Sequence, residues 1–302
     1  MNNLWDISLD VSFFRAVRWW EKLGKIQMKA KSKSNRHIEP WRHRPYILSG
    51  YRPAGESASS YLRNFFSVHN ESFDIWSHGA MFLVMLRRFI ERLNFEHYDK
   101  YPVFDVWLTV AFMFVFAAST IAHLWHMMSP ETHVALFRLD WSMIGLSSNI
   151  SAICFIGAAS GKRDTSDFEM AKFGLFFSFL VCCFHNHRIY YTMHKRFKTI
   201  LIATPSVLLM GLLLQQVDLS HKAKMKLFEL FRLPICVATF GLTCFLCHIP
   251  ERFFPGKFDM FGHSHNIHHI WSSLISVLLI RALMIIQDEN FVEFRDKVKT
   301  IV

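Results

Sequence analysis

Charged residues are scarce in this chain, and its few cysteines offer no framework for disulfides. Asp, Glu, Lys and Arg make up 19% of the 302 residues, whereas 52% are hydrophobic. All six cysteines lie inside apolar stretches, where small-residue packing explains them, the Cys244 and Cys247 pair included. The composition argues against a soluble domain and against a disulfide-rich secreted one. It predicts instead a polytopic membrane protein.

Basic residues outnumber acidic ones, 34 to 24, which gives a net charge of +10. An excess of this kind can indicate a nucleic-acid partner. Basic loops beside an anionic leaflet account for it in a membrane protein, so we expect no nucleic-acid binding. Twelve of the lysines and arginines lie in residues 1–74. Because basic segments tend to stay in the cytosol, this asymmetry predicts a cytosolic amino terminus.

Long apolar stretches recur along the chain and predict an all-α membrane protein, a bundle of seven transmembrane helices. About 20 apolar residues cross a bilayer as a helix. The first stretch is the weakest, because RRFIER (87–92) predicts a short helix broken by charge. We expect spans at about residues 73–93, 101–125, 139–159, 171–191, 199–217, 230–249 and 262–286.

This pattern divides the chain into three parts. Residues 1–72 form a cytosolic amino-terminal region, residues 73–286 the seven-helix domain, and residues 287–302 a short carboxyl-terminal tail. Within the first part, residues 8–24 predict an amphipathic helix and residues 25–37 a basic linker. That helix either lies in the membrane interface or packs on the base of the bundle.

Ionisable side chains inside membrane helices are costly, so each is a functional candidate. Ser119 and His123 lie one helical turn apart at the end of the second span, and Asp140 lies at the start of the third. His265 and His269 share one face at the start of the seventh span. Because successive spans cross in opposite directions, all five side chains are expected at one depth, near the cytosolic leaflet.

Three imidazoles with one position open are the ligand count of a catalytic zinc site. We therefore predict that His123, His265 and His269 bind zinc, which polarises a carbonyl and lowers the pKa of water. Asp140 would orient that water or act as the base. Ser119 would hydrogen-bond either Asp140 or the developing oxyanion.

The chemistry predicted for this set is hydrolysis of an amide or ester whose acyl chain lies in the bilayer. Two alternatives stay open at this point. A histidine near a helix end can simply hydrogen-bond at the level of the lipid headgroups. His268, one turn from His265, can also replace one of the two ligands on the seventh span.

Several segments resemble the progestin and adipoQ receptor (PAQR) family, which is related to hemolysin III. RPYILSGYRP (44–53) is similar to its pattern NPYI-x-x-GYR, and HNESFDIWSH (69–78) to NET-x-NIWSH. Residues 249–271 resemble VPERYFPG followed by the histidine pair. The order Ser-x-x-x-His, Asp seventeen residues later, and His-x-x-x-His also agrees. The resemblance covers about residues 44–286 and looks closest to the adiponectin-receptor-like class.

This resemblance implies a seven-helix bundle with a cytosolic amino terminus and a zinc site on the same three histidines. It implies a receptor or regulator of signalling in the Golgi membrane, with the plasma membrane as the alternative. The same residue order marks alkaline ceramidases, so a ceramide-like lipid is the expected substrate of a catalytic site. The competing expectation is a non-enzymatic Golgi scaffold that sequesters a Raf-type kinase through residues 1–60 and damps MAP-kinase signalling.

Overall fold

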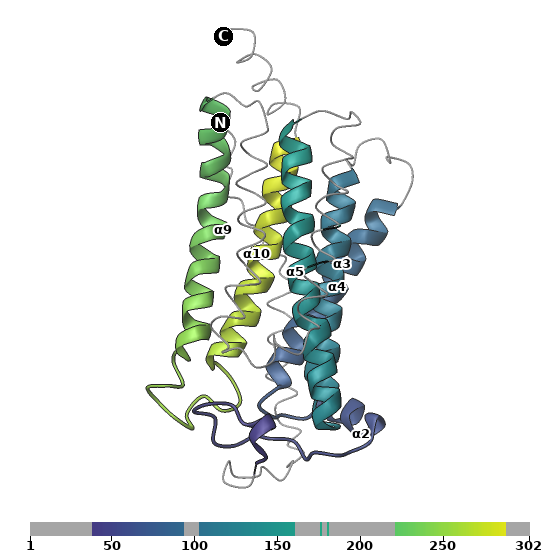
Figure 1. Ribbon diagram of the computed structural model, residues 1–302, viewed down its shortest axis with the longest axis vertical. Coiled ribbons are helices and arrows are strands. Elements are labelled where there is room, and N and C mark those ends of the chain that lie inside the picture. Colours follow the sequence, from purple (N-terminus) through teal and green to yellow (C-terminus); the bar gives the residue numbers. More distant parts are fainter. Residues whose placement is uncertain (1–37, 94–102, 161–175, 177–179, 181–220, 288–302) are drawn as a thin grey trace.

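The computed structural model is a bundle of long helices with short elements and loops closing one end (Figure 1). It describes residues 38–93, 103–160, 176, 180 and 221–287. The long helices of this part are α3 (Ser72–Leu93), α4 (Val103–Trp125), α5 (Pro130–Ser160), α9 (His221–Cys247) and α10 (Ser264–Gln287).

Two segments far apart in the sequence close the lower end of the bundle in Figure 1. We call residues 38–71 and 248–263 together the cap. The cap carries the short elements η2 (Pro40–Arg42), α2 (Ala58–Arg63) and η3 (Asn64–Phe66). The carboxyl ends of α4 and α9 and the amino ends of α3, α5 and α10 all meet this end of the bundle.

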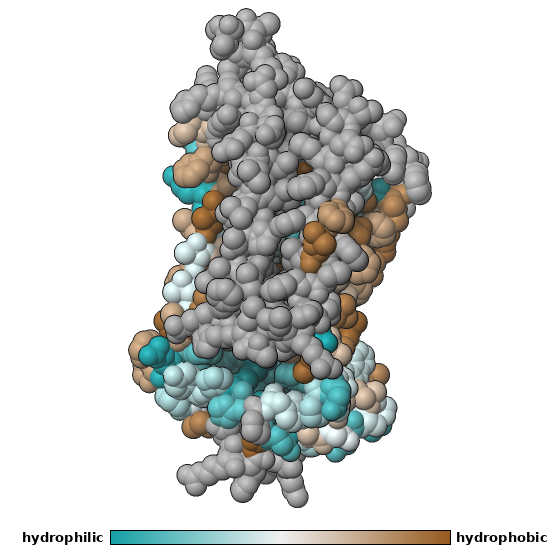
Figure 2. Space-filling view, viewed as in Figure 1, coloured by the Kyte–Doolittle hydropathy of each residue, from teal (hydrophilic) through white to brown (hydrophobic). Residues whose placement is uncertain are grey.

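The surface of the helices is mainly apolar, and the surface of the cap is mainly polar. Three segments are long and apolar enough to cross a membrane: Phe104–Trp125, Met225–Cys247 and Ser264–Gln287. Among the coloured atoms of Figure 2, hydrophilic side chains gather over the cap, and the helix surfaces above it are mainly hydrophobic. The chain is therefore a mostly helical membrane protein. The count of seven spans and the cytosolic amino terminus stay predictions.

Helix α3 differs from its prediction, because it continues through the charged segment 87–92 to Leu93 instead of breaking there. The reason is a partner on the next helix. Arg88 and Arg92 bind the two carboxylate oxygens of Asp105 on α4 at 2.6 and 2.7 Å. Asp105 is buried, so these pairs offset the cost of charge inside the bundle.

Two other helices begin earlier in the chain than the predicted spans. Helix α5 begins at Pro130 rather than at residue 139, so Asp140 lies in the interior of the helix and not at its start. Helix α9 begins at His221 rather than at residue 230 and contains Pro234. Several predicted parts lie outside the described residues: the amphipathic helix (8–24), the basic linker, the span at 199–217 and nearly all of the tail. Of the span at 171–191, only residues 176 and 180 are described.

The apolar core joins all five long helices, with Leu108, Phe116, Phe155 and Leu283 among its buried side chains. One glycine sets how closely two of the helices approach. A Cβ atom on Gly241 of α9 would lie 2.7 Å from Cβ of Trp271 on α10. Any side chain at this position would push the two helices apart.

The cap is tied to the bundle through buried polar contacts. The guanidinium of Arg52 donates to the last carbonyls of α4, those of His123 at 2.6 Å and Leu124 at 2.8 Å. Burial lowers the pKa of Arg52 to about 10, so it stays charged at neutral pH. At the start of α10, Glu251 accepts hydrogen bonds from the backbone N–H of Ser264, at 2.7 Å, and from its hydroxyl. Both contacts satisfy helix-end groups that have no partner within the helix.

Candidate metal centre

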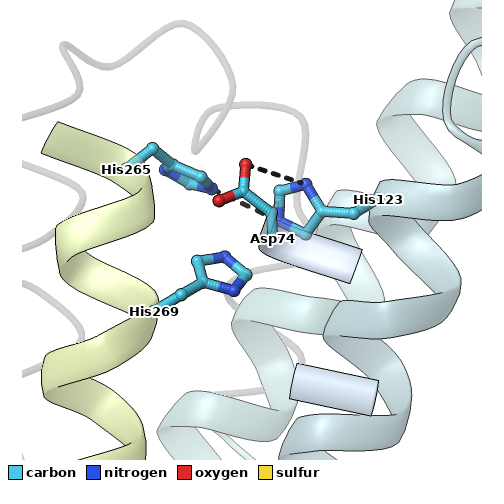
Figure 3. A group of neighbouring side chains, drawn as sticks. All are labelled: Asp74, His123, His265 and His269. Carbon is cyan, nitrogen blue, oxygen red and sulfur yellow. Dashed lines mark hydrogen bonds and ion pairs between the residues drawn. The ribbon is translucent and has the colours of Figure 1, made fainter. Parts of the chain in front are cut away.

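Three histidines and one aspartate meet where three helices reach the cap (Figure 3). His123 comes from the last turn of α4, His265 and His269 from the first two turns of α10, and Asp74 from the first turn of α3. The ligand atoms of all four lie within 4.8 Å of one another. His123, His269 and Asp74 are buried, and His265 is partly buried. The structure thus brings together the three predicted ligands and adds a fourth residue.

The distance between two of these nitrogens fits a tetrahedral metal ion. Nε2 of His123 lies 3.3 Å from Nε2 of His265. A tetrahedral zinc ion with Zn–N distances of about 2.0 to 2.1 Å holds its nitrogens about 3.3 to 3.4 Å apart. Imidazole nitrogens and a carboxylate oxygen are also ligands that zinc accepts. The Nε2 atoms of His123 and His265 are therefore already spaced to bind one zinc ion.

Neighbouring side chains turn the histidine rings toward this point. Nδ1–H of His123 donates to Oε2 of Glu71 at 2.7 Å, which leaves Nε2 facing the other ligands. Oγ of Ser77 lies 3.4 Å from Nδ1 of His269. A carboxylate or hydroxyl on the far nitrogen fixes the tautomer and orientation of a metal-binding histidine. Glu71 and Ser77 therefore act as orienting groups for two of the ligands.

Two acidic side chains and an arginine of the cap lie against the cluster. Arg44 reaches in from the cap and binds Oε2 of Glu71 at 2.8 Å, and it lies 3.6 Å from Oδ2 of Asp74. Burial by itself would raise the pKa of Glu71, but Arg44 and the hydrogen bond from His123 hold that pKa well below its usual value. Glu71 is therefore ionised. An ionised carboxylate beside the ligands favours a cation at the centre.

The predicted catalytic pair lies beside the cluster and outside the ligand group. Ser119 is buried, and its hydroxyl lies 2.8 Å from Nδ1 of His78. Asp140 is buried and interacts with Ser119 and His123, and its Oδ1 has no hydrogen-bond partner among the described residues. Ser119 and Asp140 thus reach the same end of the bundle as the histidines. Their roles stay predictions.

Two other histidines of GHSHNIHHIW point elsewhere. The ring of His268 stacks on Phe245 with centroids 4.7 Å apart. Nε2 of His263 lies 3.2 Å from the carbonyl oxygen of Asn70 in the cap. Among the described residues, neither belongs to the group with metal-ligand spacing. The structure therefore favours His265 and His269 over His268 as the pair on this helix.

The sequence analysis missed Asp74, Glu71 and His78, although all three lie in HNESFDIWSH. His78 stacks on His269 with ring centroids 3.7 Å apart. The signal was available, because the first span begins at the membrane face where the second span ends. Successive spans cross the membrane in opposite directions, which is how the other site residues were grouped. The same reasoning would have placed the first turn of the first span beside them.

The sequence matches a known family and curated relatives over most of its length. The family described as haemolysin-III related matches residues 66–278, a range that contains all four residues of the centre. The chain is 24% identical to membrane progestin receptor beta of Homo sapiens over 257 residues, which covers 80% of this chain and 72% of the relative. It is 26% identical to membrane progestin receptor alpha of Homo sapiens over 271 residues, covering 82% and 74%. The sequence-predicted adiponectin-receptor-like class stays a prediction.

Proposed function

The chain belongs to the haemolysin-III-related (PAQR) family of receptor-like membrane proteins, and we propose that it regulates signalling from a zinc centre near the cytosolic leaflet. His123, His265 and His269 hold the zinc. The observation that carries this proposal is that ring nitrogens of all three histidines lie close together, with two Nε2 atoms 3.3 Å apart. An ion there binds α4 to α10 and so couples the folded state of the bundle to the metal.

A second function, hydrolysis of a lipid amide such as ceramide, is favoured by one specific observation. Asp140 is a buried carboxyl group beside Ser119 and His123, and no described residue hydrogen-bonds its Oδ1. A bound zinc would supply Lewis-acid polarisation of the amide carbonyl and a water of lowered pKa. Asp140 would accept the proton of the attacking water, and Ser119 would donate to the developing oxyanion. The acyl chain would lie against the apolar helix surfaces.

The competing function is a Golgi scaffold that holds a Raf-type kinase and damps MAP-kinase signalling. It would bind the kinase through residues 1–60, most of which lie outside the described residues. In that case the centre would only stabilise the bundle, and substitution of its histidines would leave kinase binding unchanged. Golgi membranes are the proposed compartment, and the plasma membrane is the alternative.

The first experiment is a measurement of zinc per mole of purified protein. Wild type is compared with the His265→Ala/His269→Ala double variant and with His268→Ala, a matched histidine on the same helix. We expect near-stoichiometric zinc in wild type and His268→Ala, and none in the double variant. Ceramide hydrolysis is then assayed with Asp140→Ala as the inactive control. Folded wild-type protein that takes up no zinc would overturn the zinc proposal and favour the scaffold.

A further inference from the structure

Four side chains, not three, converge on the proposed zinc position, and the fourth is an aspartate. We propose that the carboxylate of Asp74 is a protein ligand to the zinc, so that the resting centre is closed. This inference rests on the proposed function, since it needs the zinc ion on the three histidines. It adds a ligand from a third helix, α3, which makes the ion a link between α3, α4 and α10.

The position of Asp74 is that of a ligand. Its side chain has no exposed surface. One of its carboxylate oxygens lies within 4.8 Å of the ligand nitrogens of His123, His265 and His269. Figure 3 shows the carboxylate pointing into the space between His265 and His123. A buried carboxylate among three imidazoles completes the donor set of a tetrahedral zinc.

The hydrogen bonds of Asp74 leave it with unused acceptor capacity. Nδ2 of Asn266 donates to Oδ1 at 2.6 Å, which fixes the carboxylate in place. Within the part of the chain that the structure describes, Oδ2 has no hydrogen-bond partner. Its nearest cationic group is Arg44 at 3.6 Å, and Arg44 binds Glu71 more closely, at 2.8 Å. A divalent cation bound at Oδ2 would give this buried carboxyl group a partner that stabilises its ionised form.

The two buried aspartates of this region then have different tasks. Asp74 lies in the ligand group, whereas Asp140 lies outside it, beside Ser119. Zinc held by four protein side chains is typical of structural sites, and catalytic sites keep one position open. Asp74 therefore holds the centre in a resting, structural form. Any hydrolysis with Asp140 as base requires Asp74 to leave the ion or the ion to accept a fifth ligand.

The test compares zinc affinities of Asp74→Asn, of wild type and of Asp259→Asn, measured by competition with a chromophoric zinc chelator. Asp259 is a matched control, because it is a buried aspartate of the cap that binds Leu48 N–H and the Ser49 hydroxyl and touches none of the ligands. Loss of a side chain that hydrogen-bonds a metal ligand, without binding the metal itself, weakens metal binding about 10- to 100-fold. We expect Asp74→Asn to lose more than about 100-fold and Asp259→Asn to stay near wild type.

A second variant is expected to gain an absorption band, and misfolding cannot produce that result. In Asp74→Cys loaded with cobalt(II), a thiolate within the coordination sphere would give a sulfur-to-cobalt charge-transfer band. Asp259→Cys is the control and should show none. Folded, cobalt-loaded Asp74→Cys protein without this band would overturn the inference.

The outcomes separate the inference from the proposal on which it rests. If Asp74→Asn binds zinc as tightly as Asp259→Asn, Asp74 is not a ligand, and the three-histidine centre stands. If wild type itself binds no zinc, the proposed function fails and this inference fails with it. A large loss in Asp74→Asn together with the cobalt–thiolate band supports both.

Discussion

Replacing Glu71 with glutamine would show whether the zinc centre depends on a carboxylate that orients a ligand. Oε2 of Glu71 accepts a hydrogen bond from Nδ1 of His123 at 2.7 Å and from Arg44 at 2.8 Å. Glutamine has nearly the same shape and can still accept one hydrogen bond. It lacks the charge that strengthens the contact and holds the ring with Nε2 toward the metal.

The expected loss follows from the kind of contact removed. A charge-assisted hydrogen bond contributes about 1.5 to 3 kcal/mol, against about 0.5 to 1.5 kcal/mol for a neutral one. Removal of a carboxylate that hydrogen-bonds a metal-binding histidine weakens metal binding about 10- to 100-fold. That factor corresponds to about 1.4 to 2.8 kcal/mol of zinc-binding free energy. We expect Glu71→Gln to fall within this range, a smaller loss than that of Asp74→Asn.

The assay is zinc competition with a chromophoric chelator on detergent-purified protein, with Asp259→Asn as the control. Asp259→Asn changes the charge of another buried cap carboxylate that does not contact the ligands. Size-exclusion profiles of the metal-loaded proteins establish that both variants are folded. A zinc affinity for Glu71→Gln within about twofold of wild type would refute the orienting role of Glu71.

Three further predictions concern the stability of the bundle, read from thermal midpoints in detergent. Asp105→Ala leaves two arginines inside the bundle without their carboxylate, and we expect a loss of about 3 to 5 kcal/mol; an unchanged midpoint would contradict the pairing. Gly241→Ala places a Cβ atom 2.7 Å from Cβ of Trp271 and should cost about 1 to 3 kcal/mol. Gly79→Ala, with 3.7 Å to its nearest neighbour, is its control and should not destabilise. A chelator should lower the midpoint of wild type, and zinc at a hundred times its Kd should restore about 2.7 kcal/mol; the double histidine variant should not respond to either.

Local patterns were sufficient for part of the fold. Apolar stretches long enough to span a bilayer were read directly at 101–125 and 262–286, and the structure has helices at Val103–Trp125 and Ser264–Gln287. Such helices can be read from sequence because a membrane helix satisfies its backbone hydrogen bonds within the segment itself. The bounds predicted for the first span, 73–93, agree with the helix Ser72–Leu93. Only the break expected at 87–92 was wrong, because continuity there depends on Asp105 of another helix.

The three histidines could be predicted for a related reason. His265 and His269 share a helix face by their spacing, and the alternation of spans brings His123 to the same end. Spacing and topology are properties of the chain order, so no side-chain contact needs to be known. The structure confirms that these three residues meet. Whether they hold zinc stays a prediction.

The sequence by itself determined the membrane class, the family resemblance and the three histidines. Only the tertiary structure decided which acidic groups accompany them. Glu71 meets a histidine 52 positions later in the chain, and Asp74 meets an asparagine 192 positions later. Arg44 of the cap lies against both acids. No local periodicity encodes such pairs, because they form only when helices and cap pack together and buried charges must find partners.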